Sequence, residues 1–518
     1  MTAKVRAPSR FAWWLAALPP LFVLSPLALL ALPRLKSLSR KAQWALALFS
    51  LSQVLPALGS SEPLVNLVLA AIRCLLMLGL MAVGASLDSS RALVPMAAGL
   101  GIVYATALVG SVGVQSFTGL LGQRLWHPYM TSVTLGLAGA VGVWLALFVG
   151  VRAWWRWPLG LAALVTLTLS GSRGALAAAL LGCGLGWATY RNRRRLSAGL
   201  FAGMALLSVV YVVGQRQDVA AVLRLTGSDT SGRDLIWNDT LSVIQSAPLT
   251  GVGMYRLGER LTPPGQPCQM WPSRSNEPSP CPDWLARLGN PWVIAHNVTL
   301  QQLAETGPLG LLGLFGMLGL AVSAAFIQRD PLTVAILTGM LLATVTDNTL
   351  LVPGPFIGEL FWVTIGLVLS RLPPDPPALS WPAGLTAATT LLLLSAPITA
   401  LILRQPLHQP AQVTALIAPR SVGDAAGLYD VYARVDLPAG VYRAVLRACA
   451  RNCITLDVAP VELSAGVTRH ATPRAVVHLS GHLQDVAQQK VELAIYPQKP
   501  GWHPGALASR EWTVRRGP

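Results

Sequence analysis

Residues 158–190 read PLGLAALVTLTLSGSRGALAAALLGCGLGWATY, two apolar runs joined by the short polar turn Ser170-Gly171-Ser172-Arg173-Gly174. Neither run alternates between apolar and polar residues, so neither has the pattern of a half-buried strand. In lipid, only helices and closed barrels satisfy the backbone N–H and C=O groups. The stretch therefore predicts two membrane helices that meet at a turn carrying Arg173.

The same pattern recurs along the chain. A bilayer core of about 30 Å requires roughly 20 apolar residues in a helix. The predicted spans are 11–32, 42–58, 64–86, 92–114, 131–151, 158–170, 174–190, 197–214, 307–327, 331–351, 355–370 and 383–403. We therefore predict an all-α polytopic membrane domain of about twelve helices over residues 1–403.

Composition agrees with a membrane protein and argues against nucleic-acid binding. Of the 518 residues, 53% are hydrophobic and only 12% are charged, whereas soluble domains carry about 25% charged residues. The net charge of +17 comes largely from short basic clusters between apolar stretches, such as 191–195. Such clusters are typical of cytoplasmic loops facing anionic headgroups, so the sequence predicts membrane lipids and no nucleic acid as partners.

The basic clusters also set the orientation. Placing 34–41, 152–156, 191–195 and 371 in the cytoplasm puts the Arg173 turn, a long loop 215–295 and the segment after 403 on the opposite side. One conflict remains in the first stretch, because a span over 11–32 leaves the basic N-terminus outside. That stretch is therefore either a retained anchor or a segment that is re-entrant or broken at Pro19-Pro20.

Residues 404–518 change character and predict an extracytoplasmic β-sandwich-like domain. Its β-type runs are separated by Pro, Gly and Asn turns, and they are 428–437, 442–448, 454–458, 475–479 and 491–496. Four cysteines lie on the same oxidising side, Cys268 and Cys281 in the loop and Cys449 and Cys453 in the tail. Pairing within each local pair is the simplest of three possible connectivities, and the spacing does not favour zinc.

Three motifs carry candidate chemistry. Arg173 at the outer end of two helices suits a phosphate oxygen, although an arginine snorkelling at a helix end is the plainer interpretation. Arg233, in Ser231-Gly232-Arg233-Asp234, begins a predicted helix 234–245, or alternatively lies in an exposed turn. His296, in Ala295-His296-Asn297, has an imidazole suited to taking a proton from a hydroxyl, or is an ordinary interfacial residue.

Other polar residues accompany these motifs on the same predicted side. Arg256 ends the segment Pro248-Leu-Thr-Gly-Val-Gly-Met-Tyr-Arg256 and Asn297 follows His296; both are candidates for substrate binding. Glu305 and Gly307 are predicted to be structural. Asp347 and Glu359 are further acidic candidates, because ionisable groups at membrane depth are costly.

The order of these motifs resembles the O-antigen ligase and O-antigen polymerase superfamily, which includes bacterial protein O-oligosaccharyltransferases. The resemblance rests on Ser-Arg-Gly at a helix start, Ser-Gly-Arg with a tryptophan one turn later, Pro-Leu-x-Gly-x-Gly, and His-Asn followed by Glu-x-Gly. It covers a ligase-like core of about 159–320. The resemblance implies a location in the bacterial inner membrane.

The resemblance also implies an activity. Its members transfer a glycan from an undecaprenyl-diphosphate carrier to an acceptor hydroxyl of a glycolipid, polysaccharide or protein, without a metal or other cofactor. By motif, Arg173 and Arg233 are expected to hold the diphosphate and His296 to activate the acceptor. A repeat-unit polymerase of the same superfamily remains an alternative, as does a lipid-linked oligosaccharide flippase or transporter. The insert 263–291 and the β-domain depart from a minimal ligase.

Overall fold

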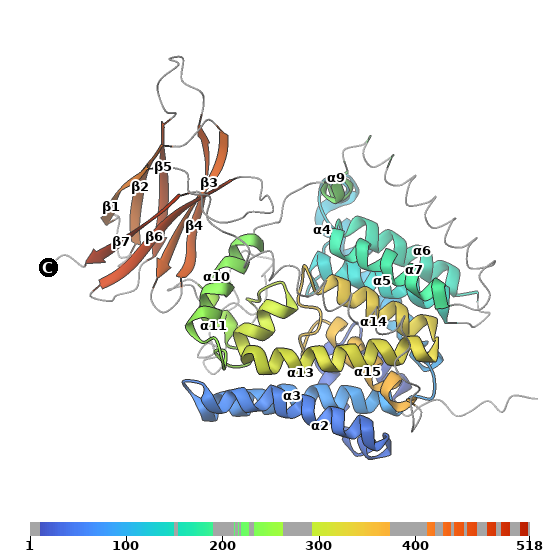
Figure 1. The fold of residues 1–518 in the computed structure, drawn as a ribbon. Helices are drawn as coiled ribbons and strands as arrows, with labels where there is room; N and C mark the ends of the chain where they lie inside the picture. The colour runs from blue at the N-terminus through green and yellow to red at the C-terminus, as the bar shows by residue number, and fades with distance from the viewer. Residues whose placement is uncertain are drawn as a thin grey trace, which may run out of the picture. The chain divides into compact units, whose positions relative to one another are not determined.

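The computed structural model describes much of the helical part of the chain and seven strands of its C-terminal part (Figure 1). The described residues are 11–149, 154–189, 212, 216, 219–226, 233–262, 293–372, 412–419, 428–436, 440–449, 453–463, 474–482, 488–497 and 508–515. The predicted span 383–403, nearly all of 197–214, and the insert with Cys268 and Cys281 lie outside these residues.

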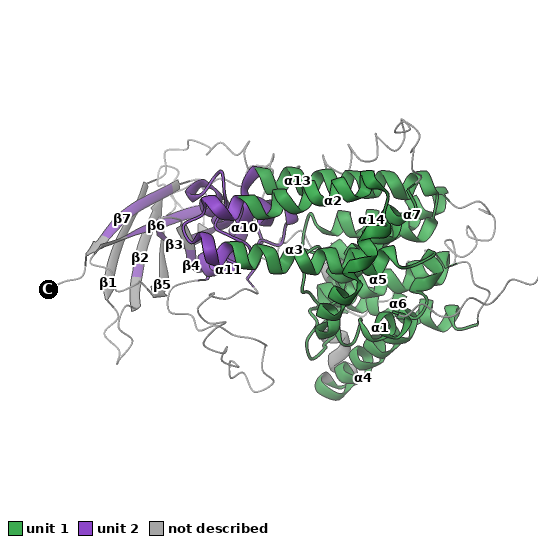
Figure 2. Ribbon diagram, turned by 90° about the horizontal axis from the view of Figure 1, so that it is seen from below, with its two compact units in different colours: residues 1–55, 67–227, 309–394 green, residues 56–66, 228–308, 395–518 purple. Residues whose placement is uncertain are grey.

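The chain forms two compact units, coloured separately in Figure 2. Unit 1 comprises residues 1–55, 67–227 and 309–394, and unit 2 comprises 56–66, 228–308 and 395–518. Unit 1 holds most of the apolar helices. Unit 2 holds the long loop from residue 228 on, together with the strands of the tail.

Most of the described helices of unit 1 overlap a predicted apolar stretch, whereas α9 lies in the predicted long loop 215–295. They are α1 (Ala12–Ala17), η1 (Phe22–Ser37), α2 (Arg40–Val54), η2 (Leu55–Gly59), α3 (Pro63–Ala85), η3 (Ser90–Leu93), α4 (Met96–Gly122), α5 (Ser132–Phe148), α6 (Arg156–Leu169), α7 (Arg173–Thr189), α9 (Ala220–Thr226), α13 (Val298–Gln328), α14 (Pro331–Ala343) and α15 (Ile357–Ser370). The ends of η2, α3 and α13 extend into unit 2.

Four helical segments within the described residues are long and apolar enough to cross a membrane. They are Arg40–Gly59, Pro63–Ala85, Ser90–Val114 and Val298–Gln328, and α5, α6, α14 and α15 are shorter apolar helices. The prediction of a mostly helical membrane protein is confirmed, and twelve spans remain a prediction. A continuous span over 11–32 is wrong, because α1 ends at Ala17 and η1 begins at Phe22. Pro19-Pro20 lies between them, and a proline in the interior of an α-helix breaks or kinks it by removing a backbone N–H and clashing with the preceding turn.

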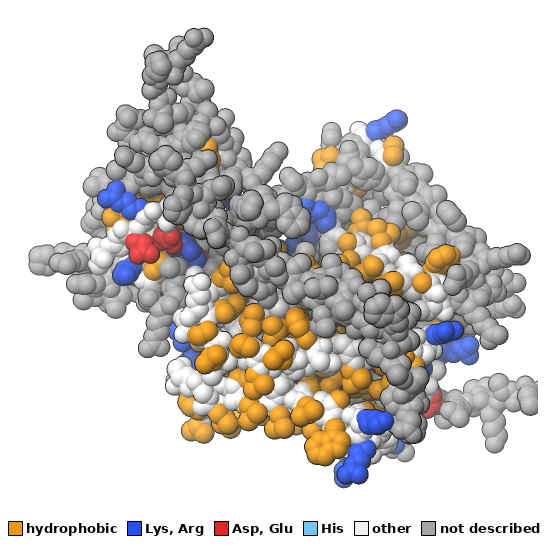
Figure 3. All heavy atoms as spheres, in the orientation of Figure 1, with side chains coloured by type: hydrophobic (Ala, Val, Ile, Leu, Met, Phe, Trp, Pro, Cys, Tyr) orange, Lys and Arg blue, Asp and Glu red, His pale blue; other side chains and the backbone are white. Residues whose placement is uncertain are grey.

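Several helices expose apolar stripes suited to lipid. On α2 and η2 the exposed side chains Trp44, Leu48, Leu51, Leu55 and Leu58 recur every three or four residues. That spacing places them on one face of the helix. Figure 3 shows hydrophobic side chains covering much of the described helical surface in that view. In water such a stripe would be unfavourable, whereas in a bilayer it faces acyl chains.

The interior of unit 1 relies on small residues where α7 and α14 approach each other. A Cβ atom added at Gly182 would lie 2.7 Å from the carbonyl oxygen of Ala335, and one at Gly339 would lie 2.7 Å from that of Ala178. Because lipid gives no hydrophobic drive for helix association, such close backbone packing supplies the contact between membrane helices. This packing fixes α7, the helix that begins with Arg173.

Unit 2 combines short helices with an antiparallel β-domain. The helices are α10 (Arg233–Ser246), α11 (Leu257–Leu261) and the first turns of α13. The strands are β1 (Gln412–Pro419), β2 (Leu428–Asp436), β3 (Gly440–Cys449), β4 (Cys453–Leu463), β5 (Arg474–His482), β6 (Gln488–Pro497) and β7 (Ala508–Arg515). They form a three-stranded sheet, β1-β2-β5, and a four-stranded sheet, β4-β3-β6-β7.

The predicted strands of the tail are present, together with two strands that the sequence pattern did not reveal. β1 and β7 were missed, and β7 reads ASREWTVR, with charged residues that hide any apolar alternation. Cys449 is disulfide-bonded and stands opposite Cys453 in the β3–β4 ladder. That register agrees with the predicted pairing of Cys449 with Cys453, and the identity of the cysteine bonded to Cys449 stays a prediction. The sandwich arrangement of the two sheets also stays a prediction.

Candidate functional site

His296 lies at a sharp backbone turn directly before α13. Its φ is +48°, in the left-handed region that a histidine seldom adopts, and its side chain is half-buried. Asn297, fully buried, caps the helix: its Oδ1 accepts hydrogen bonds from the backbone N–H of Thr299 at 3.0 Å and of Leu300 at 2.9 Å. The cap and the turn together fix where the imidazole leaves the backbone. A role of Asn297 in substrate binding stays a prediction.

The segment that follows α10 binds to the first turns of α13 through backbone hydrogen bonds. The N–H of Val252 donates to the carbonyl of Ala304 at 2.8 Å, and the N–H of Gly253 donates to that of Glu305 at 3.0 Å. The Ala304 carbonyl is available because Pro308, four residues on, has no N–H to offer it. The break in α13 at Gly307-Pro308 therefore creates the docking edge for the Pro-Leu-x-Gly-x-Gly motif.

Two glycines make this close approach possible. Gly251 has φ +68°, and a Cβ atom there would lie 2.4 Å from the backbone carbon of Glu305. Gly307 has φ +62°, and its Cβ atom would lie 2.2 Å from the carbonyl oxygen of Leu249. Any other residue would be both strained and in collision at either position. The glycines of the two motifs therefore form one interlocked contact.

The buried side chain of Glu305 stabilises the contact between this segment and α13. Its carboxylate is buried, with 1% of the residue exposed. Its Oε1 accepts from the backbone N–H of Tyr255 at 3.1 Å and from the side-chain amide of Gln301 at 2.6 Å. Gln301 in turn accepts from the N–H of Ala295, beside His296, at 2.8 Å. The structural role predicted for Glu305 is confirmed.

The variant Glu305→Ala is expected to destabilise unit 2. It leaves the Tyr255 and Gln301 donors buried without their acceptor, at about 1–3 kcal/mol each, so the free energy of unfolding should fall by about 2–6 kcal/mol. Thermal unfolding of the purified protein in detergent measures this. Glu305→Gln, which keeps an oxygen at the same place, is the matched control and should recover most of the loss. An alanine variant that melts with the wild type would show that the contact contributes nothing.

Arg256 is bound by two carboxylates of the protein. Its guanidinium lies 2.8 Å from Glu62 and 2.7 Å from Glu259, and the residue is only 6% exposed. The hydrogen bond and positive charge of Arg256 lower the pKa of Glu62 below its usual value. This arrangement joins the loop segment to the residues just before α3, within unit 2. The predicted contact of Arg256 with substrate stays a prediction.

Arg233 is the first residue of α10 and is half-buried, which confirms the predicted helix here. Trp237, one turn later, packs against a cluster of buried side chains. The cluster consists of Val243, Val252, Leu257, Leu261, Ala295, Leu300 and Ala304. Residues of α10 and of the start of α13 therefore share one hydrophobic core. Since Ala295 directly precedes His296, this core connects the Arg233 motif with the His296 motif within unit 2.

Arg173 lies in unit 1, as the first residue of α7. Gly171, two residues earlier, has φ +60° and reverses the chain after α6. A Cβ atom at Gly174 would lie 2.6 Å from the hydroxyl oxygen of Thr346. The start of α7 is therefore packed against the segment that carries Asp347, one of the predicted acidic candidates. The convergence of Arg173 with Arg233 and His296, which belong to the other unit, stays a prediction.

A second arginine accompanies the Arg173 turn and was missed by sequence reasoning. The Nε–H of Arg124 donates to the carbonyl of Ser170 at 2.6 Å, and the N–H of Leu125 donates to that of Leu169 at 3.2 Å. Both residues follow α4 within unit 1. The sequence signal was available, since Arg124 lies in the short connection between the predicted spans 92–114 and 131–151, on the same predicted side as Arg173.

Glu359 has a local structural contact. It is fully buried on α15, and its Oε1 accepts from the N–H of Gly354 at 2.7 Å. The bond closes the turn that leads into the helix.

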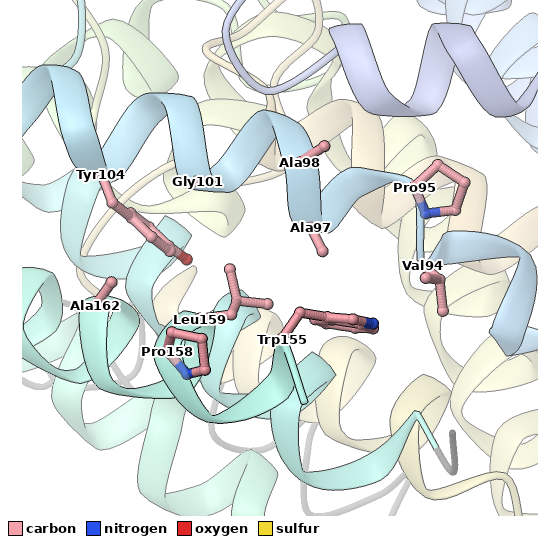
Figure 4. A pocket seen from close by; sticks show the side chains of 10 residues that line it. All are labelled: Val94, Pro95, Ala97, Ala98, Gly101, Tyr104, Trp155, Pro158, Leu159 and Ala162. Atoms are coloured by element: carbon pink, nitrogen blue, oxygen red, sulfur yellow. The ribbon is translucent and has the colours of Figure 1, made fainter. Parts of the chain in front are cut away.

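An apolar pocket of about 510 Å³ lies elsewhere in unit 1, between α4 and α6 (Figure 4). It is lined by Val94, Pro95, Ala97, Ala98, Gly101, Tyr104, Trp155, Pro158, Leu159 and Ala162. The Tyr104 hydroxyl donates to the carbonyl of Ala138 at 2.6 Å. The lining suits hydrocarbon, not a diphosphate, and contains none of the predicted site residues.

Comparison with known families agrees with the motif order. Residues 158–315 match the family model described as O-antigen ligase. The matched range begins in α6, runs through α7 and α10, and ends within α13. It therefore includes Arg173, Arg233 and His296. No curated protein matches the chain. Residues 158–315 of this membrane protein therefore match the O-antigen ligase superfamily, the family that the motif order resembles.

Proposed function

We propose that the protein is a glycosyltransferase of the O-antigen ligase type, which moves a glycan from undecaprenyl diphosphate to an acceptor hydroxyl. One observation carries the proposal: a single family match spans Arg173, Arg233 and His296 in their expected order. The local structure supports it, because Arg173 and Arg233 are the first residues of α7 and α10, and His296 lies at a turn directly before α13.

The proposed chemistry needs few groups. The acceptor oxygen attacks the anomeric carbon and a new glycosidic bond forms, while the bond from that carbon to the diphosphate oxygen breaks. The diphosphate leaves with the bonding electron pair, and Arg173 and Arg233 stabilise its negative charge. His296 takes the hydroxyl proton and returns it to water. No step in this scheme requires a metal, and Arg256 and Asn297 are assigned to substrate binding beside it.

The proposal also sets the location. About twelve membrane spans are proposed from the apolar runs, and the family resemblance suggests the bacterial inner membrane. The distribution of basic loops then puts the β-sandwich-like domain outside the cytoplasm. Unit 2 supports a shared side for loop and tail, because residues 228–308 and the strands form one compact body. A carrier lipid with a diphosphate headgroup then meets the site at the outer face of the bilayer.

Transfer with purified protein tests the function. The protein is incubated with an undecaprenyl-diphosphate-linked glycan and candidate acceptors, and the products are separated and their anomeric configuration is determined. We expect single transfers with inversion at the anomeric carbon, because attack occurs opposite the leaving group. A retained configuration would exclude single displacement. A ladder of elongated lipid-linked products would instead identify a polymerase, and movement of intact donor across vesicles without product would identify a transporter.

A further inference from the structure

Helix α10 has a second packed face, in addition to the one that contacts the hydrophobic cluster around Trp237. Leu235, Asp239 and Ser242 recur at intervals of four and three residues and therefore share one side of the helix. Leu235 packs against Val445, Ala494 and Tyr496 of the four-stranded sheet, all within unit 2. The helix that begins with Arg233 is therefore packed both on the loop core and on the C-terminal β-domain.

A buried ion pair lies at the centre of this second face. The Nε–H of Arg447 on β3 donates to Oδ1 of Asp239 at 3.0 Å, and its Nη2 donates to the same oxygen at 2.5 Å. The two side chains are only 9% and 7% exposed. Arg447 also contacts Glu492 on β6 at 3.4 Å. A buried charge left without its partner is costly, so this pair strongly favours one placement of α10 on the sheet.

The sheet is shaped to receive Asp239. The β3–β4 ladder has a register shift next to Arg447, where Leu456 of β4 is an extra residue, and such bulges redirect neighbouring side chains. β4 is also an edge strand, and α10 lies against it. The N–H of Thr455 on that edge donates to Oδ2 of Asp239 at 3.0 Å. Both carboxylate oxygens are thus held by the β-domain.

We propose that the C-terminal β-domain is a positioning element of the glycosyl-transfer site, holding α10 and with it Arg233 through the Asp239–Arg447 pair. The inference rests on the proposed function. Asp239 lies six residues after Arg233, about 9 Å along a helix axis, so a tilt or shift of α10 at Asp239 is transmitted to Arg233. Asp239 and Arg447 act on the diphosphate only through the placement of that guanidinium.

The test measures binding of undecaprenyl diphosphate to the purified full-length protein. Arg447→Met is expected to weaken binding about tenfold or more, since a misplacement near 1 Å can cost on the order of 100-fold. Asp239→Asn, which keeps the shape of the side chain, should also weaken binding. This second variant provides the test if Arg447→Met fails to fold. Arg510→Met, at an exposed position of β7, is the matched control and should bind as the wild type does.

The double variant Arg233→Ala/Arg447→Met separates positioning from general stability. If the β-domain acts through Arg233, the double variant binds no more weakly than Arg233→Ala alone. Additive losses, or wild-type binding by both Arg447→Met and Asp239→Asn, would overturn the inference. Wild-type binding and transfer by Arg233→Ala would instead overturn the assigned role of Arg233 itself, so the two failures are distinguishable.

Discussion

The variant His296→Asn is expected to lose glycan transfer by a factor of about 100 or more, because a positioned general base contributes about 10²–10⁴-fold to such a reaction. Asparagine is the sharpest replacement at this position. It tolerates the left-handed backbone that His296 adopts at φ +48°, yet its amide does not accept the proton. The rate of transfer to a saturating acceptor, measured with the assay above, checks the loss.

Three controls accompany this prediction. His296→Ala removes the ring but also strains the turn, so it should lower the melting temperature more than His296→Asn does. His478→Asn makes the same change on β5, an element that carries no proposed site residue, and should transfer glycan normally. Binding of undecaprenyl diphosphate to His296→Asn should be unchanged. Full transfer activity in His296→Asn would remove this residue from the mechanism.

Arg233→Ala and Arg173→Ala are each expected to reduce transfer by about 10²–10³-fold, the usual cost of removing one donor to developing negative charge. Lysine should restore only part of the activity at either position, because it lacks the planar fork that binds two phosphate oxygens. The measurement is kcat/KM for the lipid-linked donor. Arg510→Ala, exposed on β7, is the matched arginine control.

The double variant Arg173→Ala/Arg233→Ala tests whether the two residues, one from each unit, grip a single diphosphate. Residues that act as a unit give strongly non-additive losses. We therefore expect the double variant to lose much less than the product of the two single losses. Fully multiplicative losses would mean that the two guanidiniums act on separate groups, and the shared diphosphate site would have to be abandoned.

The sequence predicted the membrane helices from the length of their apolar runs, and the strands from short β-type runs between turn residues. The apolar runs gave α3, α6 and α7 within two residues at each end, and α10 was predicted from its polar start. Five strands followed from alternation, whereas β7 did not, because Arg510 and Glu511 interrupt its pattern. In each case the residues of the element itself were enough to predict it, because the pattern lies within a single short stretch of sequence.

The contacts that build the site leave no such local pattern in the sequence. Arg256 pairs with Glu62, and Asp239 pairs with Arg447 across 208 residues. Neither charge stands in a motif that names its partner, so only the folded chain identifies the pairs. The hydrogen bond from Val252 to the Ala304 carbonyl could not be predicted for another reason. Pro308 lacks an N–H and so leaves that carbonyl available, but the sequence does not show which segment donates to it.

The Asp239–Arg447 pair also has a consequence for biosynthesis. Arg447 follows Asp239 by 208 residues, and ribosomes add about 5–20 residues per second, so the carboxylate waits on the order of 10–40 s for its partner. Until the tail has been translated and folded, α10 has only one of its two supports. A premature stop codon between the end of the matched domain at residue 315 and β3 would therefore leave α10 without its second support, even with every motif of that domain already synthesised.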